Sequence, residues 1–268
     1  GVRLIATKTG TENTKANINV TYEHSFLQPG NVVEYTDGVT FMETYNYAQK
    51  MRSSNPTPKY SDIKIAGTRD GINEYVYPDV DWYSLMLKKF TMNERANINI
   101  QGGGSHVTYY MSLQLNHDSG VLNVPKNYSL DNNHNQMRYI FQNNLQYKVT
   151  PSTTLGLRMN AQISNLKSPN TSTDDIFRQV YNNNPVLYPA IFPDDGSGFI
   201  KFGSDYISSG SYYTNPYANM LNSFKEVNES KLNVSLNFDQ KLDFITQGLS
   251  VTALVNFNAW SSSSYTRS

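Results

Sequence analysis

The sequence predicts an all-β fold: part of an antiparallel transmembrane β-barrel whose long, partly helical loops are extracellular. Three observations predict this fold. Apolar and polar side chains alternate with a two-residue period, the alternating segments are long, and the connections between them alternate between short and long. We consider each observation in turn, because a soluble β-protein shares the first of them.

The alternation is clearest in residues 106–118, where Val107, Leu113 and Leu115 share one face and Thr108, Gln114 and Asn116 share the other. Period-two alternation is typical of a strand with two different faces. The same pattern predicts seven strands in all: 16–26, 95–101, 106–118, 137–149, 154–164, 231–242 and 249–260.

Charge is confined to one face of these seven segments. The apolar face carries no Asp, Glu, Lys or Arg, and its polar members are His24, His117, Asn143 and Gln240. A Lys or Arg that faces lipid near the bilayer midplane costs about 2–4 kcal/mol, so this exclusion is expected of a lipid-facing surface. The opposite face carries nine charged side chains: Glu23, Arg95, Asp118, Arg138, Lys148, Arg158, Lys231, Asp239 and Lys241.

Strand length and loop asymmetry favour the membrane barrel over a soluble sandwich. Strands in soluble sheets are usually about 5–6 residues long, whereas tilted strands of about 9–11 residues span a bilayer. Here six of the seven segments run 11 to 13 residues. The connections 102–105, 150–153 and 243–248 are short, with Gly, Pro and Ser typical of turns, and the connections 27–94, 119–136 and 165–230 are long. Short turns at one rim and long loops at the other are typical of outer-membrane barrels.

The amino-acid composition excludes several classes of function. The chain has 268 residues, 22 basic and 22 acidic side chains, and no cysteine. A neutral chain without a basic run is not expected to bind nucleic acid, and the lack of cysteine excludes disulfides and thiolate sites. Only 16% of the residues are charged, yet the chain is polar, because Asn, Ser, Thr and Tyr replace charge. Seven strands are too few to close a barrel with a polar interior, so we expect a piece of a larger protein.

The two long loops are predicted to contain helices. Thr40 and Glu43 form a T-x-x-E capping box, which predicts a helix that begins at Thr40. Asp81 is a plausible N-cap for a second helix, which would run past Met86 toward Lys89 and Phe90. Asp174 and Asp175 begin a third.

No catalytic, cofactor-binding or metal-binding residue is predicted, and we expect no enzyme. His24, His106, His117 and His134 are scattered without the spacing of a metal site. The segment 194–198 lacks the ligand ladder of a calcium loop, which favours an ordinary turn. Seven loop aromatics could stack on sugars or contact a partner, or could form the core of the loops themselves: Trp82, Tyr83, Tyr188, Tyr206, Tyr212, Tyr213 and Tyr217.

Short motifs occur in a fixed order along most of the chain. Together they resemble the SusC-like family of TonB-dependent outer-membrane transporters, in which the first motif, G-V-I-L-I-T-T-K-x-G, ends the plug domain. Arg3 and the pair Asn143-Asn144 depart from the family pattern. The matching segments are Gly1 to Gly10, Tyr77-Pro78 with Asp81-Trp82-Tyr83, Asn97 to Gly103, Thr108-Tyr110-Ser112 with Gly120, Arg138 to Leu145, Leu155-Gly156-Leu157, Asn184-Pro185, Tyr188-Pro189-Ala190, Asn215-Pro216 and Gly248-Leu249-Ser250.

The resemblance implies a domain organisation and a function. Residues 1–10 would end the plug, and 11–268 would form the N-terminal part of a barrel that has 22 strands in the family. The family imports oligosaccharides or peptides across the outer membrane of Gram-negative bacteria. Import is driven through TonB, and a SusD-like surface lipoprotein closes over the barrel. Two other functions stay open from the sequence: a barrel that acts as a structural scaffold in an envelope assembly, and a soluble secreted β-protein such as a lectin or a glycan-active enzyme.

Overall fold

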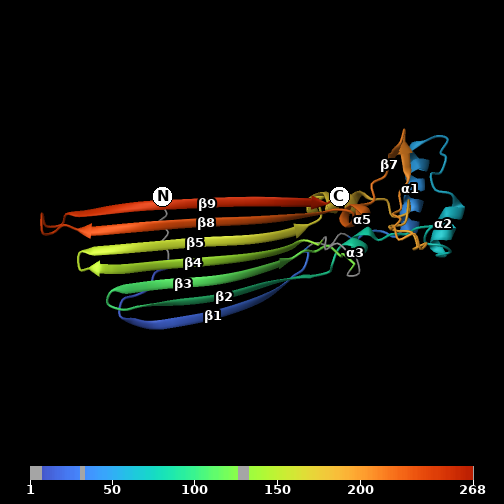
Figure 1. Cartoon of the computed structure of the whole chain (residues 1–268). Coiled ribbons are helices and arrows are strands. Elements are labelled where there is room, and N and C mark those ends of the chain that lie inside the picture. The colour runs from blue at the N-terminus through green and yellow to red at the C-terminus, as the bar shows by residue number, and fades with distance from the viewer. Residues whose placement is uncertain (1–7, 31–33, 126–132, 268) are drawn as a thin grey trace.

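Seven long strands form one antiparallel sheet in a computed structural model of the chain (Figure 1), which describes residues 8–30, 34–125 and 133–267. The order across the sheet is β1-β2-β3-β4-β5-β8-β9, so each strand lies beside its neighbour in sequence apart from the insertion between β5 and β8. The strands are β1 Thr14–Leu27, β2 Thr91–Gly103, β3 Val107–Ser119, β4 Asn135–Thr150, β5 Thr153–Ser168, β8 Phe224–Lys241 and β9 Ser250–Arg267.

The structure confirms all seven predicted strands and lengthens six of them, while the segment predicted at 106–118 keeps its length as β3. The segment predicted at 95–101 is the clearest case, since β2 begins at Thr91 and pairs with β1 and β3 along nearly its whole length. Polar residues such as Asn93 and Glu94 belong to this strand because their backbone groups form hydrogen bonds with β1 and β3. The strand therefore extends beyond the apolar pattern that predicted it.

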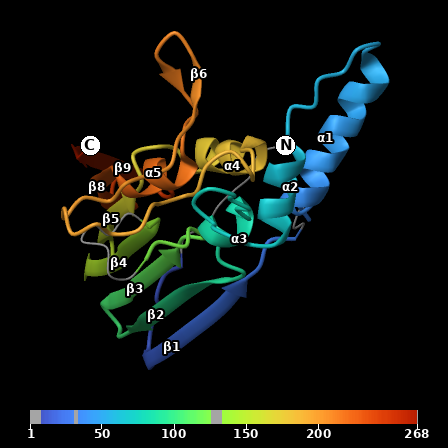
Figure 2. The same cartoon turned by 90° about the vertical axis from the view of Figure 1, so that its right-hand side faces the viewer.

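The long connections gather at one end of the sheet, where they form what we call the loop layer: residues 34–90, 120–125 and 169–223 (Figures 1 and 2). The elements of the loop layer are α1 Gly38–Arg52, α2 Asp62–Arg69, α3 Trp82–Met86, α4 Thr173–Asn182, β6 Tyr206–Ser208, β7 Ser211–Tyr212 and α5 Pro216–Leu221. In Figure 2 the hairpin of β6 and β7 projects from this layer.

The predicted start of the first helix is wrong. Helix α1 begins at Gly38 and Asp37 is its N-cap, because the Asp37 carboxylate accepts hydrogen bonds from both the backbone N–H and the hydroxyl of Thr40. A carboxylate is the stronger acceptor at a helix N-terminus, so it displaces Thr40 from the capping position. Glu43 therefore does not close a capping box, and instead its carboxylate lies 2.6 Å from the guanidinium of Arg69.

The other two predicted helices are present. Asp81 caps α3 as expected, but the helix ends at Met86, because Leu87 turns into an extended bridge with Leu122. The cap of α4 is Ser172, which places Asp174 and Asp175 in the first turn. The sequence patterns did not predict helices α2 and α5 or the β6–β7 hairpin.

The buried core of the chain lies in the loop layer rather than in the sheet. One cluster joins Trp82 and Met86 of α3 to side chains of α4, α5 and the connection after β3; among them Leu122, Ile176 and Met220 are fully buried. A smaller cluster surrounds Met42 and Val186. The sheet by contrast exposes large apolar side chains, such as Val20, Leu113 and Val255. Within the described residues, no helix is long and apolar enough to cross a membrane.

Candidate functional site

The register of the sheet aligns side chains into continuous polar rows on one face. One row crosses all seven strands without an apolar member: Asn19, Asn99, Ser112, Gln142, Asn160, Asn233 and Asn258. Side-chain hydrogen bonds link such rows; the Asn97 amide, for example, donates to the Ser112 hydroxyl at 3.0 Å and the Asn99 amide donates to Asn97 at 2.9 Å. This polar face could line an aqueous passage.

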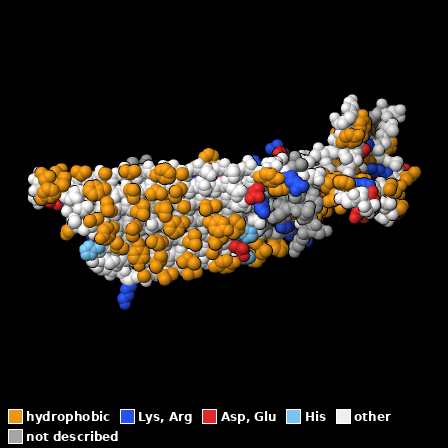
Figure 3. All heavy atoms as spheres, viewed as in Figure 1, with side chains coloured by type: hydrophobic (Ala, Val, Ile, Leu, Met, Phe, Trp, Pro, Cys, Tyr) orange, Lys and Arg blue, Asp and Glu red, His pale blue; other side chains and the backbone are white. Residues whose placement is uncertain are grey.

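The opposite face carries matching apolar rows. The row that contains Leu113 is apolar throughout: Val20, Ile98, Leu113, Phe141, Ala161, Leu232 and Ala259. Figure 3 shows apolar side chains spread over the whole length of the sheet, with few charges among them. An exposed apolar area that crosses seven strands is far larger than soluble monomers normally leave open to water.

This apolar face ends in a titratable cluster near the loop layer. With β2 extended to Thr91, Glu94 lies on the apolar face, and its carboxylate is 3.6 Å from the His24 ring and 3.3 Å from the His117 ring. One row further out, Lys167 is paired in register with Glu226. The exclusion of charge therefore holds for the predicted strand segments and stops at this level, as expected where an apolar band meets a polar boundary.

The chain that precedes β1 lies on the polar face. The Asn144 amide donates to the carbonyl oxygen of Lys8 at 2.6 Å, and Lys148 forms an ion pair with Glu12. Gly10 is in such close contact with the β2–β3 hairpin that a Cβ atom there would lie 2.3 Å from the carbonyl oxygen of Gly102, so only glycine fits. Residues 8–12 are thus held against the polar face of the sheet by specific contacts.

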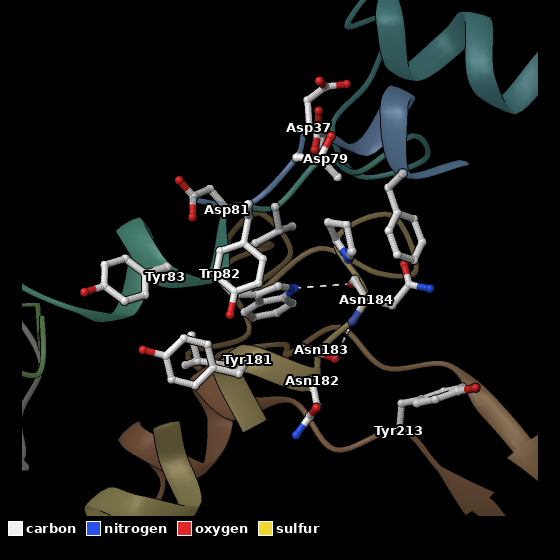
Figure 4. Close-up of a pocket in the computed structure, with 16 residues that line it drawn as sticks. Asp37, Asp79, Asp81, Trp82, Tyr83, Tyr181, Asn182, Asn183, Asn184 and Tyr213 are labelled. Atoms are coloured by element: carbon white, nitrogen blue, oxygen red, sulfur yellow. Dashed lines mark hydrogen bonds between the residues drawn. The ribbon is translucent and has the colours of Figure 1, made fainter. Parts of the chain in front are cut away.

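The loop layer contains a pocket of about 700 Å³ between the 34–90 and 169–223 segments (Figure 4). Aromatic rings form much of its wall: Tyr83 and Tyr181 lie on one side in Figure 4, and Tyr213 lies on the opposite side. The carboxylates of Asp37, Asp79 and Asp81 also line the pocket, and so do Asn182, Asn183 and Asn184.

Each carboxylate of the pocket is fixed by the backbone. Asp37 caps α1 and Asp81 caps α3 by accepting from the Ser84 N–H at 3.0 Å, while Asp79 accepts from the Gly38 N–H at 2.9 Å. Helix caps of this kind hold a charged side chain in one orientation without a cationic partner. In the described part of the chain, no Lys or Arg lines the pocket and no ion pair involves these three residues.

The floor of the pocket is where the two long loops join. The Trp82 indole N–H donates to the carbonyl oxygen of Asn184 at 3.3 Å, and the Val80 N–H donates to the carbonyl oxygen of Pro185 at 2.9 Å. The Asn184 amide donates to the Tyr60 hydroxyl at 3.0 Å, and its side-chain oxygen accepts from the Val186 N–H. The two family-like motifs Asp81-Trp82 and Asn184-Pro185 are therefore in direct contact.

The local environment shifts three pKa values in the pocket, among them that of Tyr83, which burial and the nearby Tyr181 raise above 10.0. The backbone N–H and the hydroxyl of Thr40 stabilise the Asp37 carboxylate and lower its pKa below 3.8, so Asp37 is ionised at neutral pH. Burial, with the nearby Tyr181, Tyr83 and Asp81, raises the pKa of Tyr35 above 10.0, which keeps that hydroxyl neutral. The pocket is therefore aromatic and negatively charged.

The loop aromatics divide between the alternatives that the sequence leaves open. Trp82, Tyr188 and Tyr217 are buried in the loop core. Tyr83 and Tyr213 line the pocket, as does Trp82. Tyr206 and Tyr212 contact each other on the projecting hairpin, with ring centroids 5.8 Å apart.

The remaining predictions concern metals and the 194–198 segment. Within the described residues, no group of three or more His, Asp or Glu side chains has the arrangement of a metal site. The segment 194–198 is a turn, as predicted, in which Asp194 accepts from the Gly196 N–H at 2.8 Å and Asp195 forms an ion pair with Lys201.

Sequence reasoning missed Tyr35, Asp37, Asp79 and the Asn182–184 run as members of one site. Asp37 precedes a predicted helix, so its capping role was available as a signal. Nothing in a two-residue or helical period indicates that residues near 37, 80 and 183 meet in space, because long-range contacts bring them together.

The chain thus combines a long sheet with an apolar and a polar face, an N-terminal segment in contact with the polar face, and a folded loop layer at one end. These features can be compared with those of known proteins. The chain is 26% identical over 223 residues to "TonB-dependent receptor P26" of Formosa agariphila, a match that covers 82% of this chain and 19% of that receptor. No protein-family model matches the chain.

Solved structures give the same answer for the fold. The chain superposes on the RagAB peptide importer in its closed-closed state with a TM-score of 0.66 at 16% identity, covering 98% of this chain and 30% of that one. The open-open state of the same importer gives a TM-score of 0.63 at 15% identity over 96% and 29% of the two chains. These findings confirm the resemblance to SusC-like TonB-dependent transporters. The chain spans about a fifth of the curated receptor and under a third of the importer chains.

Proposed function

We propose that this chain is one wall of the barrel of a TonB-dependent transporter that imports oligosaccharides or peptides across the outer membrane of a Gram-negative bacterium. In this proposal residues 1–10 end the plug domain, although residues 1–7 lie outside the described part of the chain. Residues 11–268 then contribute the first strands of a barrel of 22 strands. A SusD-like lipoprotein closes the barrel, and TonB supplies the energy for transport.

The observation that carries this proposal is the alignment of polar and apolar rows across all seven strands. A row such as Asn19 to Asn258 would line a water-filled interior, and a row such as Val20 to Ala259 would face lipid. An open sheet edge is not tolerated in a bilayer, so further strands must pair with β1 and β9.

The position of residues 8–12 supports the same assignment of faces. A plug fills the interior of a barrel, so the chain that leaves it must start on the interior wall. Lys8, Gly10 and Glu12 contact the polar face through Asn144, Gly102 and Lys148. The short turns then lie at the periplasmic rim, and the loop layer faces the exterior and the lid.

Nothing in the described residues supports a chemical reaction, and the relatives are named as a receptor and an importer. We therefore propose binding and transport rather than catalysis.

The test uses the full-length protein in its native strain. A deletion of its gene is expected to abolish cellular uptake of one class of oligosaccharide or peptide, and a protonophore is expected to abolish the same uptake in the parent strain. The full-length protein should also be recovered from outer membranes together with a surface lipoprotein. Uptake that survives both the deletion and the protonophore would contradict active import.

A further inference from the structure

The pocket of the loop layer has a chemistry that distinguishes among possible cargoes. Three carboxylates, held by helix caps and a backbone N–H, share a space of about 700 Å³ with the rings of Tyr35, Tyr83, Tyr181 and Tyr213. This volume lies within the usual range of ligand sites, about 300–1,000 Å³.

The charges of the pocket have no counterpart in the described chain. Asp37, Asp79 and Asp81 line the pocket together, and none of its described lining residues is Lys or Arg. The N–H and O–H groups that hold the carboxylates stabilise their charge but supply no full positive charge, so a cation that enters is still attracted by all three groups.

The aromatic rings add a second and independent preference for a cation. Tyr35 and Tyr181 are stacked with centroids 6.1 Å apart, and Tyr83 lies 6.3 Å from Tyr181. The faces of aromatic rings attract ammonium and guanidinium groups, an effect that grows when the site is partly shielded from water. A neutral sugar would stack on the rings and donate hydroxyl groups to the carboxylates, but it lacks the positive charge that the carboxylates and the ring faces both attract.

We propose that this pocket binds the cationic group of a peptide, either a Lys or Arg side chain or an N-terminal amine. The inference rests on the proposed import function and narrows its cargo to peptides with a basic group.

The binding test uses the full-length transporter, purified in detergent, and isothermal titration calorimetry. The probes are an acetylated and amidated Gly-Gly-Lys-Gly-Gly peptide, the same peptide with Gln in place of Lys, and maltohexaose. We expect the Lys peptide to bind at least ~10-fold more tightly than the Gln peptide, and its affinity to fall as NaCl is raised.

The decisive variant is the triple substitution Asp37→Asn, Asp79→Asn and Asp81→Asn. Asparagine keeps the side-chain oxygen that caps a helix, so the charge is lost while the fold is retained. The triple variant should lose the preference for the Lys peptide. The matched control is Asp62→Asn in the first turn of α2, outside the pocket, and should keep that preference.

A second variant, Tyr181→Leu, guards against a folding defect in the triple variant. It removes one ring and no charge, and should weaken Lys-peptide binding about threefold. Equal affinity for the Lys and Gln peptides would overturn the inference. So would a Lys preference that persists in the triple variant, or tight maltohexaose binding that none of these substitutions changes.

The inference and the proposed function fail separately. If the protein bound peptides in a charge-dependent way but uptake were insensitive to a protonophore, the proposed import function would be contradicted and the assignment of the pocket would stand. Protonophore-sensitive uptake of a cargo that the triple variant carries as well as the parent would keep import and remove the pocket assignment.

Discussion

The sheet and the loop layer are built by different means. In the sheet, each strand pairs with its neighbours over nearly its full length, and its side chains alternate between an apolar face and a polar face. In the loop layer, short helices are joined by single hydrogen bonds between distant residues, such as the bond from Trp82 to the carbonyl oxygen of Asn184. The described sheet has almost no buried core, whereas the loop layer has two apolar clusters.

This difference corresponds to the two demands that the proposed function would place on the chain. A wall between lipid and water needs a repeated pattern, and many substitutions preserve a pattern. A binding pocket needs particular side chains at particular positions, because Asp37, Asp81 and Tyr181 must meet from three separate segments. We therefore expect the wall to be sensitive to the face on which a residue lies, and the loop layer to be sensitive to the identity of the residue.

The largest effect is expected in the loop core. Trp82→Ala would remove a side chain that is 3% exposed and would leave a cavity, at a cost of about 3–5 kcal/mol. The loop layer should become sensitive to limited proteolysis, while the sheet stays folded, because its strands pair without Trp82.

The matched control is Phe199→Ala, which removes a ring that is 79% exposed and should leave the protease pattern unchanged. If Trp82→Ala instead lowered the amount of folded barrel in the outer membrane, the sheet and the loop layer would fold as one unit. The conclusion that they are stabilised independently would then be wrong.

The next effect concerns the wall. Leu113→Arg would place a charge on the apolar face, in a row that is apolar on all seven strands, at a cost of about 2–4 kcal/mol. The neighbouring substitution Gln114→Arg would place the same charge on the polar face, where Arg138 and Arg158 already lie. Folded yield in outer membranes, measured by heat-modifiable migration on gels, should fall for Leu113→Arg and be nearly normal for Gln114→Arg. Equal yields would contradict the assignment of faces.

How much could be predicted from the sequence also follows this division. All seven strands follow from the two-residue period, because each face of a strand has one constant environment. Their ends do not: Glu94 belongs to β2 since the backbone hydrogen bonds of β1 and β3 continue past the apolar pattern.

The candidate pocket was only partly predictable. Asp81 was identifiable as a helix cap from its local sequence, and the family-like motifs at Asp81-Trp82 and Asn184-Pro185 indicated positions of importance. That these two motifs bond to each other could not be predicted, since the contact joins residues about 100 positions apart and no local period records it. The prediction of where α1 begins was wrong for a simpler reason. Two residues, Asp37 and Thr40, can cap the helix, and the carboxylate of Asp37 is the better hydrogen-bond acceptor.

A smaller effect is expected from one buried polar residue, Asn215. Its side-chain oxygen caps α5, and its amide donates to the carbonyl oxygens of Ala190 and Gly203, both at 2.8 Å. Asn215→Ala should destabilise the loop layer by about 2 kcal/mol, measured by hydrogen exchange of α5, since it removes the cap and leaves two carbonyls unpaired. Asn215→Asp keeps the capping oxygen but places a buried carboxylate oxygen against these two carbonyl oxygens, so it should destabilise the loop layer at least as much as Asn215→Ala.

The control is Asn222→Ala at the exposed C-terminal end of the same helix. An effect of Asn222→Ala as large as that of Asn215→Ala would show that α5 is sensitive to any change, and that these specific bonds do not hold it.

The smallest effect is a dependence of α1 on acid. The folded-state pKa of Asp37 lies below the ordinary 3.8, so its stabilisation of the helix N-terminus is complete above that pH and is lost as the pH falls through the lowered pKa. Amide exchange of the first turn of α1 should therefore accelerate below about pH 3.8 relative to the centre of the helix. Asp37→Asn should remove this acceleration, because the amide caps without titrating. If first-turn exchange in the Asp37→Asn variant still accelerated over the same range, the acid sensitivity would belong to another group and not to Asp37.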